Sequence, residues 1–300
     1  MTRWRAIAQL ESKLTHWVQK RTAWLRIGLF LLLLGLAWLP FGALVYLPDG
    51  WLNGSSAAES VVLALLYIGF LSGLPYWGSQ VHAWRYPFQR CGLIFQAQTA
   101  RDLLLALVIG VLGVYGLFGL ETLLGWAVPS SPSPRLVRFI VEGLVMALAV
   151  GFAEEMLFRG WVLAELEKDY GSAAARSMNA VFFAVMHFIK PWAEIVRTLP
   201  QFFGLVILGM ALVWARRSPT GPKRQRATRL GYPIGLHAGL IWGYYIVTVG
   251  GLSEYTGRAP EWITGIDSNP LAGLLGLILL GLIASAFAKT AQATTDDNLS

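Results

Sequence analysis

The chain has 300 residues, 55% of them hydrophobic and only 14% charged, and its mean hydropathy is +0.54. Soluble domains carry about 25% charged residues, so this composition favours a polytopic membrane protein over two soluble domains, and it excludes a disordered chain. The single cysteine, Cys91, excludes an internal disulfide framework. A net charge of +7 is expected from cytoplasmic loops, so we predict a lipid bilayer as a partner and no nucleic acid.

Runs of about 20 mostly apolar residues predict membrane-spanning helices. Eight such runs lie at residues 24–47, 57–77, 102–124, 136–157, 173–189, 198–214, 232–249 and 271–288. The predicted fold class is therefore all-α, a polytopic helical membrane bundle with about eight transmembrane helices. No room remains for a sizeable soluble domain.

The predicted spans divide the chain into four segments. Residues 1–23 form an amphipathic cytoplasmic lead-in, 24–134 hold the first three spans, 135–250 hold spans four to seven, and 251–300 hold the last span and a polar tail. With the N-terminus inside, 19 of the 24 Lys and Arg residues lie in inside segments. The positive-inside rule then predicts a multi-pass integral membrane protein with both termini cytoplasmic.

Ionisable side chains gather at the end of the fourth span, within residues 151–159 (GFAEEMLFR). Charged groups at membrane depth are costly and usually have a function. Glu155 and Arg159 are one helical turn apart, which suits an ion pair, whereas Glu154 points about 100° away from Glu155. We expect one acid to be held by the arginine while the other faces a different helix.

Two histidines, His187 and His237, lie inside the fifth and seventh apolar runs. Taken alone, each is more often a hydrogen-bonded packing residue than a ligand. Gly235, Ala238 and Gly239 around His237 allow close helix approach, which is ordinary membrane packing.

Considered together, an acid and two imidazoles on three helices predict a shared site in the bundle. Such groups activate water for attack on an amide. One carboxylate with two histidines also suits Zn²⁺ with an open position for water, so Glu154, His187 and His237 are candidate metal ligands. The alternative hypothesis is that the same three side chains activate the water without a metal ion.

The order and spacing of these residues resemble a known family. Glu154-Glu155-x-x-x-Arg159 resembles an EExxxR motif, Phe183-x-x-x-His187 resembles an FxxxH motif, and His237 begins the segment of a third motif. This is similar to the CPBP (Abi) family of intramembrane proteases, related to the type II CAAX prenyl endopeptidases. The resemblance covers about 136–249.

The resemblance implies an eight-helix intramembrane endopeptidase that acts on a membrane-associated peptide or protein. It implies that Glu154 and His187 prepare the attacking water and that His237 stabilises the oxyanion. It places Glu155 and Arg159 in supporting positions.

One position departs from the family pattern. The third motif usually has Asn or Asp four residues after its histidine, where this chain has Ile241. Trp242, Tyr244 or Tyr245 is then needed as a replacement donor. The departure keeps a second hypothesis open, a catalytically inactive membrane scaffold or immunity-type protein of the same fold.

A third hypothesis is a transporter or channel, with Glu142, Glu154 and His187 on a proton path. Against that role, Glu142 is also expected to pair with Arg138 one turn earlier.

The predicted spans do not place the three candidate groups at one depth. Counted at about 1.5 Å per residue, His187 lies too deep in a helix that starts at Ala173 to meet Glu154 near the cytoplasmic face. A helix start near Asn179, a protruding fifth helix or a strong tilt would each bring them together.

Overall fold

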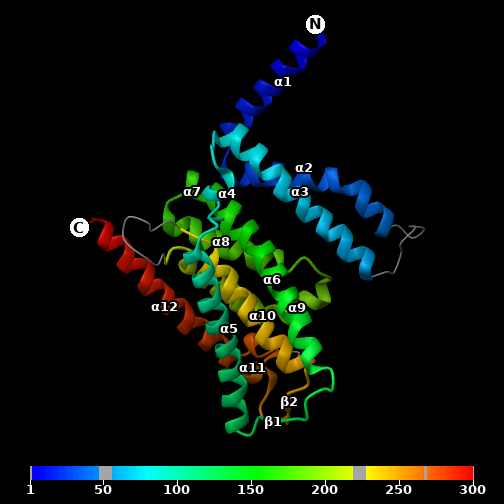
Figure 1. The fold of residues 1–300 in the computed structure, drawn as a ribbon, viewed down its shortest axis with the longest axis vertical. Helices are drawn as coiled ribbons and strands as arrows, with labels where there is room; N and C mark the ends of the chain where they lie inside the picture. Colours follow the sequence, from blue (N-terminus) through cyan, green and yellow to red (C-terminus); the bar gives the residue numbers. More distant parts are fainter. Residues whose placement is uncertain (1, 47–55, 219–227, 267–268, 300) are drawn as a thin grey trace. The chain divides into compact units, whose positions relative to one another are not determined.

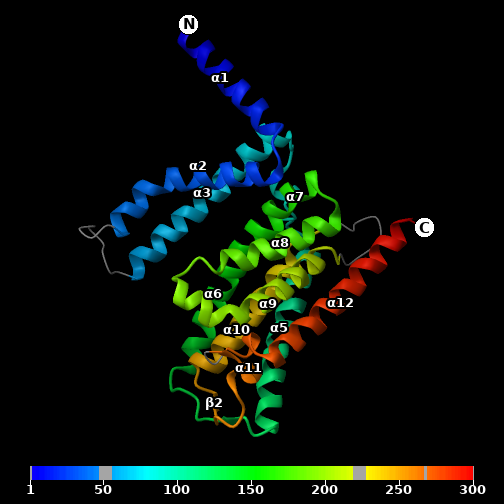
Figure 2. The same ribbon diagram turned by 180° about the vertical axis from the view of Figure 1, so that it is seen from behind.

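The computed structural model describes residues 2–46, 56–218, 228–266 and 269–299. Helices form nearly all of the described chain, which confirms the all-α membrane bundle (Figures 1 and 2). Two short strands, β1 (Ala127–Pro129) and β2 (Ser253–Tyr255), pair antiparallel with Ala127 opposite Tyr255. The chain divides into two compact units, residues 1–91 with 164–170, and residues 92–163 with 171–300.

The second unit contains all three predicted motifs. Its elements are α5 (Ala97–Leu123), α6 (Leu136–Glu155), a π-helix η1 (Met156–Val162), α8 (Ser172–Met186), α9 (Trp192–Arg216), α10 (Gly231–Val249), α11 (Glu261–Thr264), a 3-10 turn η4 (Pro270–Ala272) and α12 (Leu274–Leu299). The polar tail predicted after the last span is therefore helical through Leu299. Helix α10 packs against α5, α6 and α9, while α12 and α8 pack on α9 (Figures 1 and 2).

Six helices of the described chain are long and apolar enough to cross a membrane. They cover 23–44, 58–82, 97–123, 136–169, 192–216 and 274–292, and so overlap six of the eight predicted spans. The other two predicted spans are also helices. Helix α8 has 15 residues, about 22 Å of rise, which is short for a bilayer core of about 30 Å. Helix α10 has 19 residues, but glycines, tyrosines and His237 dilute its apolar side chains.

Helix α10 is enclosed by protein, which explains this composition. Most of its residues are buried, and Leu236 and Leu240 join the main apolar cluster of the unit with Phe158, Phe183 and Leu212. A helix that faces other helices does not need a lipid-compatible surface. It needs small residues where neighbouring backbones come close.

The first unit contains α1 (Thr2–Gln19), α2 (Ala23–Tyr46), α3 (Ser56–His82), α4 (Pro87–Arg90) and most of α7 (Leu163–Asp169). A buried ionic network holds it. Glu165 accepts hydrogen bonds from Arg26 (2.8 Å) and Trp77 (2.8 Å) and lies 2.6 Å from His82 Nε2. The His82 side chain, which is 1% exposed, is thus a buried member of this network.

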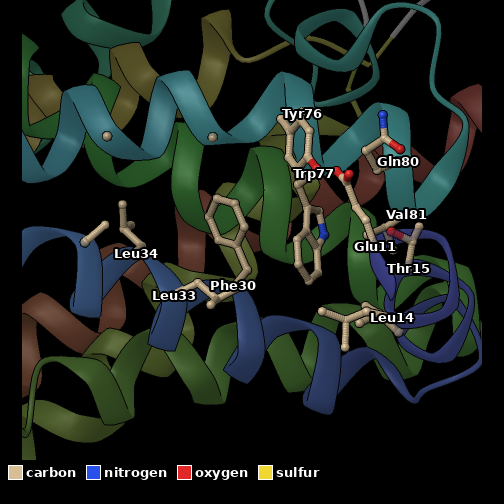
Figure 3. A pocket seen from close by; sticks show the side chains of 14 residues that line it. Glu11, Leu14, Thr15, Phe30, Leu33, Leu34, Tyr76, Trp77, Gln80 and Val81 are labelled. Carbon is tan, nitrogen blue, oxygen red and sulfur yellow. Dashed lines mark hydrogen bonds between the residues drawn. The ribbon is translucent and has the colours of Figure 1, made fainter. Parts of the chain in front are cut away.

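A mainly apolar pocket of about 330 Å³ lies between α1, α2 and α3 (Figure 3). Leu33, Leu34 and Phe30 of α2 line one side, and the Tyr76 hydroxyl donates to Glu11 at 2.6 Å at the other end. None of the residues of the three motifs lines it.

Glycines set the distance between α10 and α5. A Cβ on Gly235 would lie 2.0 Å from the carbonyl oxygen of Leu103, and one on Gly239 would lie 2.3 Å from that of Leu107. Both separations are shorter than any stable contact, and backbone cannot move aside as a side chain can. This confirms the close approach predicted from the small residues around His237.

We therefore expect Gly239→Ala to destabilise the protein by about 1–3 kcal/mol through overpacking. The matched control is Gly116→Ala on α5, where a Cβ has nothing within 4 Å and helix propensity favours alanine by roughly 1 kcal/mol. Unfolding midpoints in mixed detergent micelles would compare them. Equal midpoints for the two variants would contradict this account of α10 packing.

Candidate active site

The pair of acids stands at the end of α6, and its second member is fully buried. Glu155 Oε1 lies 2.8 Å from Arg159 Nη1, and both side chains have 0% exposure. The i,i+4 ion pair predicted from the sequence is thus confirmed. The same oxygen lies 2.9 Å from His237 Nδ1 on α10, so one carboxylate connects the α6 end to the third motif.

Directly after these acids the helix widens into the π-helix η1. π-helical turns are rare and often occur at functional sites. Side chains from other helices bind its carbonyls: Asn179 Nδ2 of α8 donates to Phe158 O at 2.8 Å, and the Arg216 guanidinium of α9 donates to Arg159 O. The segment that carries Arg159 is therefore held from two sides.

The first acid faces the two histidines. Glu154 Oε2 lies 3.6 Å from His187 Nε2 and 3.9 Å from His237 Nε2, and their side chains are 28%, 32% and 7% exposed. These separations are too long for direct hydrogen bonds but short enough for one bridging water. Glu154 Oε2 itself is buried and has no hydrogen-bond partner among the described residues. The predicted convergence of Glu154, His187 and His237 is present.

The other ring nitrogens fix the direction of each imidazole. His187 Nδ1 lies 2.8 Å from the carbonyl oxygen of Phe183, which only accepts hydrogen bonds, so Nδ1 carries the proton. His237 Nδ1 is likewise a donor, because its neighbour is Glu155 Oε1, an oxygen that also accepts from Arg159. In the neutral rings both Nε2 atoms are then acceptors, directed at the carboxylate of Glu154. With both rings neutral, a water placed between these groups would donate to two of the three acceptors, whereas a protonated His237 ring would itself donate from Nε2.

Phe183 explains why the second motif needs an aromatic residue. Its buried ring lies 4.4 Å from the His187 ring and 6.0 Å from the His237 ring, centroid to centroid. The Arg159 guanidinium carbon lies 4.1 Å over its face, a cation–π contact. The phenylalanine thus orders both histidines and covers the buried charge.

His187 reaches the site from the end of its helix. Helix α8 starts at Ser172, so the start near Asn179 is wrong. His187 is the C-cap of α8, and it meets Glu154 where α6 ends. The two side chains are thus adjacent although α8 starts at Ser172.

Trp242 does not replace the hydrogen-bonding side chain that the family has at the position of Ile241. Ile241 packs against the apolar cluster of Leu107, Ala147 and Ala238. The Trp242 indole N–H donates to Ile140 O at 2.9 Å, so it is not free to bind an oxyanion.

Glu142 does not join the site. It pairs with Arg138 at 2.7 Å on the exposed side of α6, as predicted. A proton path through Glu142, Glu154 and His187 therefore lacks its first member.

The three candidate ligands do not form a metal site as they stand. Across the described ranges, no group of three or more His, Cys, Asp or Glu side chains is arranged to hold a metal ion. The donor chemistry still suits zinc, because two unprotonated Nε2 atoms and a carboxylate face one another. The zinc hypothesis stays a prediction.

A comparison with protein families supports the resemblance that the motifs indicate. Residues 136–243 match the family model described as type II CAAX prenyl endopeptidase Rce1-like. This region, just over a third of the chain, contains all five site residues. The match confirms the CPBP-type, CAAX-protease-like family resemblance indicated by the motifs. No curated protein and no solved structure matches the chain.

Sequence reasoning missed the two residues that hold the π-helix. Asn179 is fully buried, and an amide inside an apolar helix was an available signal, since such groups seek a partner across helices. Arg216 counted only as a loop charge, although it is 4% exposed and binds the backbone of Arg159. Nothing in the sequence distinguishes it from neighbouring arginines.

The two ion pairs on α6 and η1 give a matched test of burial. Glu155→Gln leaves Arg159 charged and buried, and removing one partner of a buried pair costs about 3–5 kcal/mol. Glu142→Gln makes the same change in the exposed pair with Arg138, where the cost is at most about 1 kcal/mol. Denaturation midpoints of the purified variants measure the difference. A Glu155→Gln protein as stable as Glu142→Gln would refute the buried bridge.

Proposed function

We propose that the protein is an intramembrane endopeptidase that hydrolyses a peptide bond of a membrane-associated substrate. The observation that carries the proposal is the convergence of Glu154 on both His187 and His237, at 3.6 Å and 3.9 Å. The family match over residues 136–243 supports a CAAX-protease type of chemistry.

In this mechanism Glu154 and His187 bind and orient the attacking water. One O–H of the water donates to the Glu154 carboxylate and the other to His187 Nε2, which is free because Nδ1 donates to Phe183 O. As the water oxygen attacks the carbonyl carbon, Glu154 takes the proton. The tetrahedral intermediate then breaks its C–N bond, and Glu154 returns the proton to the leaving amine.

His237 is assigned to the oxyanion. It can donate from Nε2 only when that nitrogen is protonated, and Nδ1 already donates to Glu155. The donating ring is therefore an imidazolium, which the Glu155 carboxylate stabilises at 2.9 Å. Glu155, with Arg159 on its other side, is a positioning residue and touches no substrate in this scheme.

Removal of the carboxylate at residue 154 provides the main test. Glu154→Gln is expected to lower cleavage by about 10²–10⁴-fold, because the amide cannot accept the proton. The measurement compares new peptide termini in membranes of cells with wild type and variant. Glu142→Gln, the same change on the exposed face of α6, is the control and should keep wild-type cleavage.

The second candidate is an inactive scaffold of the same fold. The feature that favours it is Ile241, which supplies no hydrogen bond where the family has an amide or carboxyl, while the Trp242 donor is already used. Identical sets of peptide termini in wild type and Glu154→Gln cells, at equal protein levels, would establish this reading instead.

Zinc would supply a Lewis acid for the water if Glu154, His187 and His237 hold it. In that case purified wild type should contain stoichiometric zinc, and His187→Ala/His237→Ala should lose it, in elemental analysis. Background zinc in both proteins would leave water activation to the side chains alone. Thermal midpoints of the two proteins show whether the double variant is folded.

A further inference from the structure

A second recess opens beside His187, on the side of α9 and α12. It encloses about 250 Å³. Its apolar lining includes Leu205, Leu208 and Leu280, together with Gly204. Its polar lining is His187, Lys190, Gln201 and Asn269. The mechanism above uses only His187 from this set.

Lys190 is held in one position at this recess. Its ammonium donates to Thr198 Oγ1 at 2.5 Å and lies 4.5 Å over the ring of Phe188. Thr198 is 3% exposed and donates its own proton to Glu194 O at 2.6 Å, so its lone pairs are free to accept from the lysine. A lysine fixed in this way loses less entropy when it binds a ligand.

The charge of Lys190 has no counterion in the part of the chain that the structure describes. No carboxylate there lies within ion-pair distance of it. The acid one turn away, Glu194, pairs with Arg197 at 2.6 Å. Two of the three ammonium protons therefore remain for a ligand, at the edge of an apolar recess where charge attraction is weakly screened.

We propose that this recess is an anion subsite in which Lys190 binds a carboxylate of the peptide substrate. The inference rests on the endopeptidase function, because His187 lines the recess and also faces Glu154 at 3.6 Å. A group bound at Lys190 is therefore close in sequence to the bond that is cleaved. Lys190 is a specificity-determining residue, and the apolar lining takes the side chain next to the carboxylate.

Two substrate groups share this chemistry, a free C-terminal carboxylate and the side chain of Asp or Glu. Peptides with an apolar anchor, embedded in lipid nanodiscs, distinguish them. One peptide ends in a carboxylate, a second ends in an amide, and a third ends in an amide but carries a glutamate after the cleaved bond. Mass spectrometry of the products gives kcat/KM for each.

Wild type should cleave one of the two acidic peptides at least about tenfold faster than the neutral amide, as expected for one charge-assisted hydrogen bond. Lys190→Met should lose that preference, so that it cleaves the acidic and neutral peptides at similar rates, and Lys190→Arg should keep part of it. Lys289→Met, an exposed lysine on α12, is the control that keeps the preference. An unchanged preference in Lys190→Met overturns the subsite.

Binding separates this inference from the proposed function. The same peptides, labelled with a fluorophore, are titrated with Glu154→Gln and with Glu154→Gln/Lys190→Met, neither of which needs to turn over. About tenfold tighter binding of an acidic peptide, lost in the double variant, supports the subsite. Equal binding overturns it. If wild type cleaves nothing beyond Glu154→Gln while the binding preference holds, the endopeptidase proposal fails and the subsite stands.

Discussion

The arrangement of the site depends on one buried carboxylate that is shared between two helices. Glu155 binds Arg159 within its own helix and His237 on α10, and neither acid nor arginine reaches solvent. Burying two charges is costly unless both are paired and further hydrogen bonds complete the pair. The histidine supplies one such bond to Glu155 Oε1, while Glu155 Oε2 and Arg159 Nε and Nη2 have no hydrogen-bond partner among the described residues. This bond fixes the ring that faces Glu154. The buried ion pair thus determines how the His237 ring is placed relative to Glu154.

The π-helix extends the same constraint to the second motif. Its wider turn leaves carbonyls that need donors, and Asn179 and Arg216 provide them from α8 and α9. Phe183, one turn beyond Asn179, then lies against both the Arg159 guanidinium and the two imidazoles. The α6–η1 segment, α8, α9 and α10 are therefore joined here by hydrogen bonds between a polar group of one helix and one of another.

The sequence was sufficient to predict the helices and to single out the side chains that converge, because charges inside apolar runs stand out. The i,i+4 spacing alone predicted the ion pair between Glu155 and Arg159. The helical periodicity also predicted that the Glu154 side chain points away from that pair. The sequence was not sufficient for depth, since nothing in residues 173–189 shows that α8 ends at Met186 and presents His187 at its cap. It predicted α10 only as one more membrane span, and it did not show that most of this helix is enclosed by other helices. Whether neighbouring helices surround a helix depends on the tertiary fold, and the hydropathy of its sequence does not predict this.

The glycine contacts of α10 have a consequence for how a peptide enters. Because Gly235 and Gly239 press on the backbone at Leu103 and Leu107, α10 cannot rotate or slide without collision, and His237 is immobile with it. His187 has no such backbone collision beside it: its ring is held by Phe183, but it lies beyond the last turn of a short helix and is the most exposed of the three site side chains. The site is therefore more accessible from the α8 side, whereas α10 forms a closely packed wall opposite.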